Sequence, residues 1–151
     1  MKKFKANDNK NEEHEINYRQ FNKKLELLNQ ILSLISDINQ ASDEKEVKDC
    51  IPALLQYTGE YTDADRVYIF ELMSEKQDYY SNTFEWCREG IVPQIDNLIR
   101  ISADSMPVWH EKFLRGETII IHDLEKICET MPLEYDILKV QDIHSLLVLP
   151  L

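Results

Sequence analysis

Residues 66–87, RVYIFELMSEKQDYYSNTFEWC, contain two strand-like runs separated by a polar turn. Arg66 to Met73 and Tyr79 to Cys87 are rich in β-branched and aromatic side chains, whereas SEKQD between them is hydrophilic. Side chains alternate between the two faces of a strand, and one face of the second run carries Tyr80, Asn82, Phe84 and Trp86. The stretch therefore predicts an antiparallel hairpin, covered on one side and polar on the other.

Shorter elements follow the hairpin. We predict strands over 98–102 and 117–124, a helix that starts at Pro107 and closes at Gly116, and a helical region over 132–142. Residues 145–151, SLLVLPL, form a nearly continuous apolar run, which predicts a fully buried strand. Helices and strands in this order indicate an α+β domain.

The region before the hairpin is expected to be helical. Residues 1–15 are almost wholly polar and predict a disordered tail, whereas 16–40 predict a long amphipathic helix with apolar side chains at alternating spacings of three and four. The candidate dimer-interface residues in that row are Phe21, Leu25, Leu28, Leu32 and Ile35. A second row (Leu27, Ile31, Leu34, Ile38) lies beside the first. One row could cover the chain's own domain while the other meets a second copy, or both rows could pack within the chain.

A second helix is predicted after a break at 41–43. Asp43 and Glu46 have the spacing of a capping box, and Thr58-Gly59 is the expected end of the helix.

Charge and glycine content exclude several classes of function. The 151 residues carry a formal charge of −11, so the mean surface field repels phosphate backbones and anionic lipid, and we expect neither nucleic-acid nor membrane contact. Three glycines, none clustered, argue against a phosphate-binding loop. Three widely spaced cysteines are expected to be reduced thiols in a cytoplasmic protein. The isolated histidines predict no metal site.

Several segments resemble, in order, the GAF domains of bacterial diguanylate cyclases and sensor histidine kinases. These are ADRVYIF (64–70), SNTFEWCREGIVPQIDNL (81–98), LRGE (114–117), IIHDL (120–124) and QDIHSLLVLPL (141–151). The resemblance covers residues 42–151 and implies a GAF-like, PAS-related antiparallel sheet flanked by helices. Such domains usually continue into a further strand and helix, so we expect 42–151 to be a sensor domain incomplete at its C-terminus, in a fragment of a longer protein.

The resemblance also implies a function. We expect a non-catalytic, homodimeric regulatory module that binds an unidentified small molecule and controls a cyclase or kinase output domain through the helix over 16–40, which would act as a coiled coil. No cofactor is assigned. The candidate pocket residues are Phe84, Trp86, Arg100, Trp109, Phe113, Asp123, Tyr135 and Leu138.

Two alternatives stay open. A related enzyme, free methionine sulfoxide reductase, uses the same fold with cysteine chemistry, for which Cys87 or Cys128 would be the candidates here. The chain could also be a ligand-free dimerisation scaffold whose cleft is filled by its own side chains.

Overall fold

The structure is a computed structural model that describes residues 2–74 and 78–151. By its contacts the chain divides into two compact units, which are described one after the other. The first unit is Met1–Ile69 with Phe84–Pro93, and the second is Phe70–Thr83 with Gln94–Leu151.

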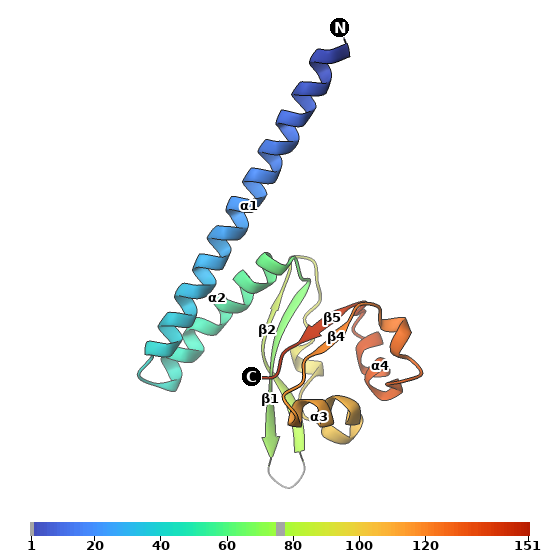
Figure 1. The fold of residues 1–151 in the computed structure, drawn as a ribbon. Helices are drawn as coiled ribbons and strands as arrows, with labels where there is room; N and C mark the ends of the chain where they lie inside the picture. Colours follow the sequence, from blue (N-terminus) through green and yellow to red (C-terminus); the bar gives the residue numbers. More distant parts are fainter. Residues whose placement is uncertain (1, 75–77) are drawn as a thin grey trace. The chain divides into compact units, whose positions relative to one another are not determined.

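Two helices make up most of the first unit. Helix α1 (Lys2–Gln40) and helix α2 (Glu44–Thr62) lie side by side as a helical hairpin (Figure 1). Asp43 Oδ1 accepts a hydrogen bond from the backbone N–H of Glu46 at 2.9 Å, and Glu46 Oε2 accepts one in return from the N–H of Ser42 at 2.8 Å. The predicted capping box is therefore confirmed as the start of α2.

Helix α2 ends later than predicted. It runs through Gly59 to Thr62, and Asp63 takes the left-handed conformation after its last turn with φ of 58°. The N–H of Asp63 bonds back to the carbonyl of Gly59. The prediction that Thr58-Gly59 ends the helix was wrong because Gly59 is needed for close packing, and an aspartate serves at the cap.

Helix α1 begins at Lys2, where the sequence predicted a disordered tail over 1–15. Residues 2–15 contain neither glycine nor proline, so nothing in them stops a helix that is already formed from 16 onward. Extending an existing helix adds one hydrogen bond for each residue fixed, whereas starting a new one is costly.

A three-stranded sheet has the order β1-β2-β3. Its strands are β1 (Arg66–Ser74), β2 (Asp78–Cys87) and β3 (Ile101–Ser102). Strands β2 and β3 are antiparallel, with Tyr80 opposite Ile101. The two long strands lie where the sequence predicted them, but β3 is shorter than the predicted 98–102. Before β3, Ile95–Asn97 form a short 3-10 helix and Arg100 has a φ of 57°, which interrupts the extended backbone.

A separate two-stranded sheet joins β4 (Ile119–Ile121) to β5 (Leu146–Val148) in antiparallel fashion. The α+β class with antiparallel pairing is confirmed, although the described strands form two sheets and not the one expected. The prediction that 145–151 is fully buried was wrong: Leu147 is 60% exposed. Strand β5 alternates inward and outward because its sheet is covered on one face only.

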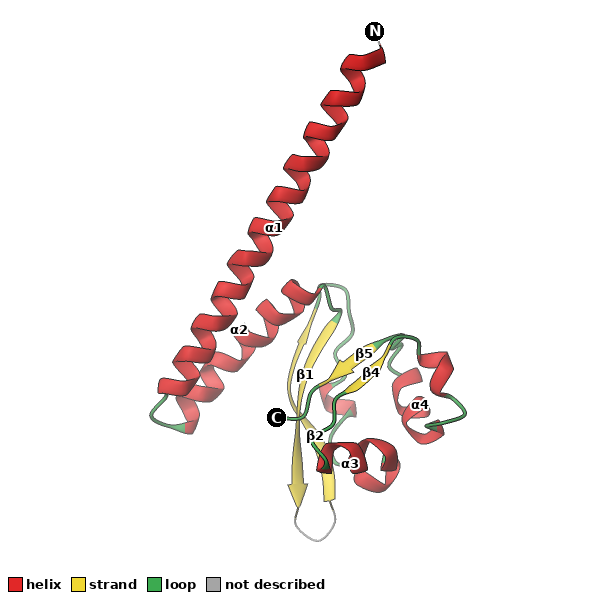
Figure 2. Ribbon diagram, viewed as in Figure 1, coloured by secondary structure: helices red, strands yellow, loops and turns green. Residues whose placement is uncertain are grey.

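Short helices cover the inner face of the β4–β5 sheet in the second unit (Figure 2). They are α3 (Pro107–Leu114), the 3-10 helix Leu124–Ile127 and α4 (Pro132–Lys139); a further 3-10 turn, Ala103–Ser105, precedes α3. The predicted fourth strand was too long because 124–127 turn helical around a capping Asp123, and α4 stops before 142, where Asp142 has positive φ. The buried cluster consists of Ile119, Ile121, Leu124, Ile127 and Leu138.

Within residues 2–74 and 78–151, no helix combines the length and the apolar character needed to cross a membrane.

Candidate functional site

Tyr80 of β2 lies at the centre of a polar and aromatic layer beneath α3. Its side chain is buried, and its Oη shares a hydrogen bond of 2.8 Å with His110 Nδ1. The Tyr80 ring also makes edge contacts with the rings of His110 and Phe113. Burial raises the pKa of Tyr80, and the negative charge of Asp78 raises it further, so the phenol stays neutral. We call this region, between the Tyr80 face of β2 and helix α3, the β2–α3 layer.

Glu134 of α4 holds the start of α3. The side chain is 2% exposed, and its Oε1 accepts hydrogen bonds from the backbone N–H groups of Val108 at 2.8 Å and Trp109 at 3.3 Å. Met106 at the N-cap position provides no side-chain cap, so a carboxylate from another helix satisfies these donors. The sequence reading missed Glu134. Its spacing of four from Leu138 and seven from Gln141, both buried, was the available signal.

Among the described residues of the second unit, two side chains have buried polar atoms with no hydrogen-bond partner. Both Nδ2 and Oδ1 of Asn82 are buried and unbonded, and the side chain is 4% exposed. The indole Nε1 of Trp109 is also buried and unbonded. Asn82 was not among the predicted pocket residues, although a single amide on an otherwise aromatic strand face was a visible signal.

Four of the predicted pocket residues take part in the packing of the second unit. The rings of Trp109 and Phe113 meet edge to face with centroids 6.0 Å apart, and both pack against the buried clusters around Tyr80 and around Ile121. Leu138 is buried, and Tyr135 packs beside it.

Arg100 and Asp123 are occupied by local contacts. The Arg100 guanidinium stacks over the ring of Tyr79 at 4.1 Å and donates to its hydroxyl at 3.2 Å, at the surface. Asp123 Oδ1 accepts from the backbone N–H of Glu125 at 3.2 Å and caps the 3-10 turn. Each contact accounts for its residue without a ligand.

Phe84 and Trp86 belong to the first unit, where Trp86 packs on α2. Its ring lies so close to Gly59 that a Cβ built there would be 2.1 Å from Cζ3. Trp86 therefore fixes the last turns of α2 against the end of β2.

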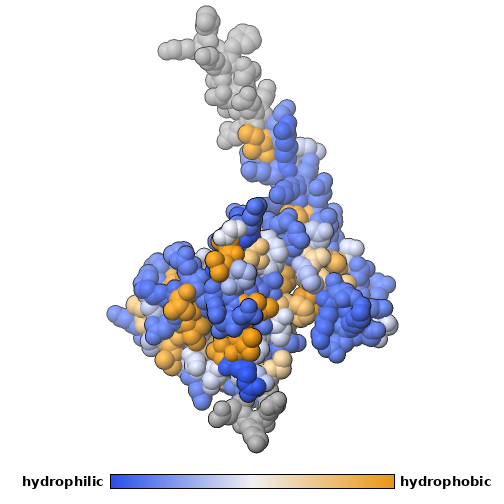
Figure 3. Space-filling model, turned by 180° about the vertical axis from the view of Figure 1, so that it is seen from behind, coloured by the Kyte–Doolittle hydropathy of each residue, from blue (hydrophilic) through white to orange (hydrophobic). Residues whose placement is uncertain are grey.

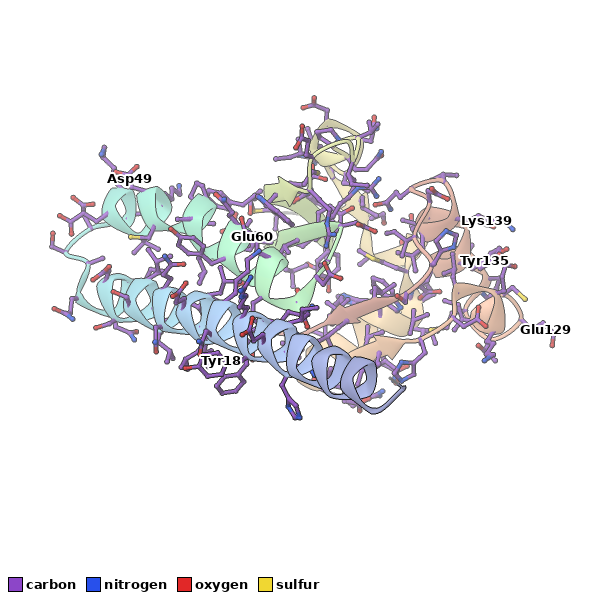
Figure 4. All side chains as sticks on the ribbon, turned by 90° about the horizontal axis from the view of Figure 1, so that it is seen from above. Tyr18, Asp49, Glu60, Glu129, Tyr135 and Lys139 are labelled. Carbon is purple, nitrogen blue, oxygen red and sulfur yellow. The ribbon has the colours of Figure 1, made fainter. Side chains whose placement is uncertain are left out.

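A charged cluster surrounds Tyr135 on the outside of α4 (Figure 4). Tyr135 Oη donates to Glu125 Oε2 at 2.9 Å and accepts a short hydrogen bond from Lys139 Nζ. The bond to Tyr135 and the nearby charge of Glu125 raise the pKa of Lys139. The charges of Lys139 and Glu125 neutralise each other, with Nζ and Oε1 3.5 Å apart. Such pairs are typical of a solvated helix surface.

Helix α1 presents two different apolar faces. Leu27 is buried, and Ile31, Leu34 and Ile38 are half-buried, on the face that packs against α2. The other row is open: Phe21 is 64% and Leu32 55% exposed, and Tyr18 projects away from α2 (Figure 4). Figure 3 shows separate hydrophobic patches among hydrophilic side chains on the described part of this helix. We call the exposed row Phe21, Leu25, Leu28, Leu32 and Ile35 the α1 seam.

The thiol of Cys87 is not activated. Cys87 donates to Glu85 Oε1 at 3.4 Å, and burial together with this carboxylate raises the pKa of Cys87 to about 11. Cys50 and Cys128 are free thiols, and Cys128 is exposed. Among the described residues, no group of three or more histidines, cysteines and carboxylates converges to hold a metal ion.

The chain is similar in structure to proteins of known structure. No family model matches the chain, and no curated protein matches its sequence. A solved structure described as the far-red absorbing dark state of JSC1_58120g3 with bound biliverdin IXa is 14% identical, with a TM-score of 0.47. The match covers 63% of this chain and 50% of that one, so the chain spans about half the length of the structure that it matches.

Proposed function

We propose that the chain is a non-catalytic regulatory module of the GAF type that senses a small molecule and forms a homodimer through the α1 seam. In a longer protein it would control an output domain such as a diguanylate cyclase or a histidine kinase. The order of helices, hairpin and short elements agrees with the sequence resemblance, which supports this assignment.

The division of α1 into two faces is the observation that carries the proposal. One face packs on α2 within the chain, and the seam on the other face is exposed over about four helical turns. Seam residues recur at alternating steps of three and four, the repeat that keeps a helix in contact with a second helix. Asn22, Asn29 and Ser36, which flank the seam on one side, are uncharged and add no repulsion there between two copies of charge −11.

Sedimentation analysis of two matched triple variants tests the dimer. We expect the wild-type chain to be a dimer and Leu25→Gln/Leu28→Gln/Leu32→Gln to be a monomer with unchanged helix content by circular dichroism. The control is Lys23→Gln/Glu26→Gln/Ser33→Gln, whose three positions are exposed on α1 outside the seam, and it should remain a dimer. A monomeric wild type, or a dimer that survives loss of the seam leucines, would refute this interface.

A ligand-free dimerisation scaffold is the second candidate. It is favoured by the direct packing of Trp109 on Phe113 and of Phe113 on Tyr80, which places aromatic rings where a ligand was expected. The two candidates share the seam and differ only in the β2–α3 layer. Ligand binding to that layer therefore decides between them.

Cysteine catalysis is disfavoured at Cys87. A thiol with a pKa near 11 is protonated at neutral pH, and the thiolate is the nucleophilic form. The raised pKa therefore argues against a reductase mechanism that uses Cys87 and supports a non-catalytic role for the chain.

A further inference from the structure

The unbonded amide of Asn82 is the strongest sign of a ligand in the second unit. A buried amide without partners costs free energy that folded proteins generally avoid. Asn82 carries two such atoms: Oδ1 can accept and Nδ2 can donate. Its backbone N–H is already satisfied by the carbonyl of Leu98 at 2.9 Å, so only the side chain lacks a partner.

The position of Asn82 puts this amide in the β2–α3 layer. Asn82 follows Tyr80 by two residues in the same strand, so both side chains lie on the same face. Tyr80 contacts α3 through His110 and Phe113, and Trp109 of α3 packs against the same buried cluster. Trp109 also has an unbonded indole N–H, which is a second donor on the helix that contacts Tyr80.

The charges around the layer indicate a neutral ligand. His110 is bonded to Tyr80, and Glu134 is bonded to the start of α3. Two described basic residues lie close in sequence to β3 and α3. Arg100 is stacked on Tyr79 at the surface, and Lys112 is paired with Glu117 at 3.7 Å. An anionic group would thus enter a buried layer without a counter-ion, which is costly.

We propose that Asn82 and Trp109 bind a small neutral ligand through an edge that carries both a hydrogen-bond donor and an acceptor, as in a lactam or a primary amide. The donor of the ligand would donate to Asn82 Oδ1. Its acceptor would accept from Asn82 Nδ2 or from the indole N–H of Trp109. This inference rests on the proposed small-molecule sensing and specifies the chemistry of the ligand.

Side-chain NMR with 2-pyridone as the probe tests the proposal on the full chain. The chain has two tryptophans, so Trp109→Phe assigns the Trp109 indole signal and leaves that of Trp86 as an internal control. We expect 2-pyridone to shift the Asn82 amide and the Trp109 indole signals saturably, with little change at Trp86. N-methyl-2-pyridone, which lacks the donor, should bind at least about tenfold more weakly.

The variant Asn82→Leu keeps a side chain of similar size and should lose binding by at least about tenfold. Absence of a saturable shift, or equal affinity for the two pyridones, would overturn the proposal from the wild-type chain alone. Equal affinity of Asn82→Leu and wild type would also overturn it. Failure here would favour the scaffold and leave the dimer standing, whereas a monomeric wild type would refute the α1 seam and leave this site untouched.

Discussion

A Cβ atom on Gly59 would lie 2.1 Å from Cζ3 of Trp86, so the indole ring occupies the space in which any other side chain would begin. In the middle of an exposed helix, alanine is about 1 kcal/mol more favourable than glycine. Here two carbons must move apart, and overpacking of this kind costs about 1–3 kcal/mol. We therefore expect Gly59→Ala to lower the free energy of unfolding in urea.

The control for Gly59→Ala is the same change in a Trp86→Ala background. Without the ring the helix preference for alanine should dominate, and the substitution should become neutral or stabilising. A stabilising effect in the wild-type background would show that the ring does not restrict this position.

The Arg88–Asp63 pair predicts a dependence of stability on pH. Arg88 Nη2 donates to Asp63 Oδ1 at 2.7 Å, and this bond, with the charge of Arg88, holds the pKa of Asp63 below its ordinary 3.8. A lowered folded-state pKa gives stability that is present above the ordinary value and is lost as the pH falls through the folded value. The difference in Tm between wild type and Asp63→Asn should therefore shrink from neutral pH to about pH 3.

Asparagine is a suitable replacement for Asp63 because it also tolerates the left-handed backbone found there. A difference in Tm that is constant with pH would mean that the charge of Asp63 contributes nothing.

Removal of the buried carboxylate of Glu134 should destabilise the second unit. Glu134→Ala leaves the N–H groups of Val108 and Trp109 without their acceptor, which costs about 1–3 kcal/mol. Glu134→Gln keeps a carbonyl acceptor and should lose less. Urea unfolding measures both, with the exposed Glu129→Ala as a control expected to change stability by no more than about 0.5 kcal/mol. Equal losses for alanine and glutamine would contradict the capping role.

Alkylation by iodoacetamide should distinguish Cys87 from Cys128. With a pKa of about 11, only about one Cys87 in a thousand is a thiolate at pH 8, so it should react far more slowly than the exposed Cys128. Peptide mass spectrometry should show the Cys87 rate rising about tenfold per pH unit until about pH 11. Glu85→Gln removes the adjacent charge and should accelerate it.

The raised pKa of Cys87 also makes the free energy of unfolding depend on pH. Its contribution is complete below the ordinary value of 9.0 and is lost as the pH rises through about 11. Rapid labelling of Cys87 at neutral pH would contradict the burial and return the cysteine-enzyme alternative to consideration.

The sequence predicted the order of elements well because periodicity and turn residues act locally. The ends of elements were harder. Gly59 has the sequence signature of a helix end, but a ring distant in the chain determines its role. The apolar run at 145–151 has the composition of a buried strand, yet its exposure depends on which faces other elements cover.

In the candidate site too, local features could be predicted from the sequence, whereas contacts between elements could not. That Trp109 and Phe113 pack in the second unit could be predicted, because large aromatic side chains stand out in a sequence. Glu134, His110 and the amide of Asn82 were missed because their partners come from other elements. Whether a polar side chain is satisfied is a property of the folded layer, and no local pattern reports it.

Because the α1 seam is exposed in a single copy, the apparent Tm of the chain should depend on protein concentration. A single copy leaves those leucines in water, and in the proposed dimer the free energy of covering them is gained only when two copies associate. The apparent Tm of the chain should then rise with protein concentration, and by less once the seam is polar. The stability of the folded chain would thus depend on its concentration, and a dilute sample would unfold more readily than a concentrated one.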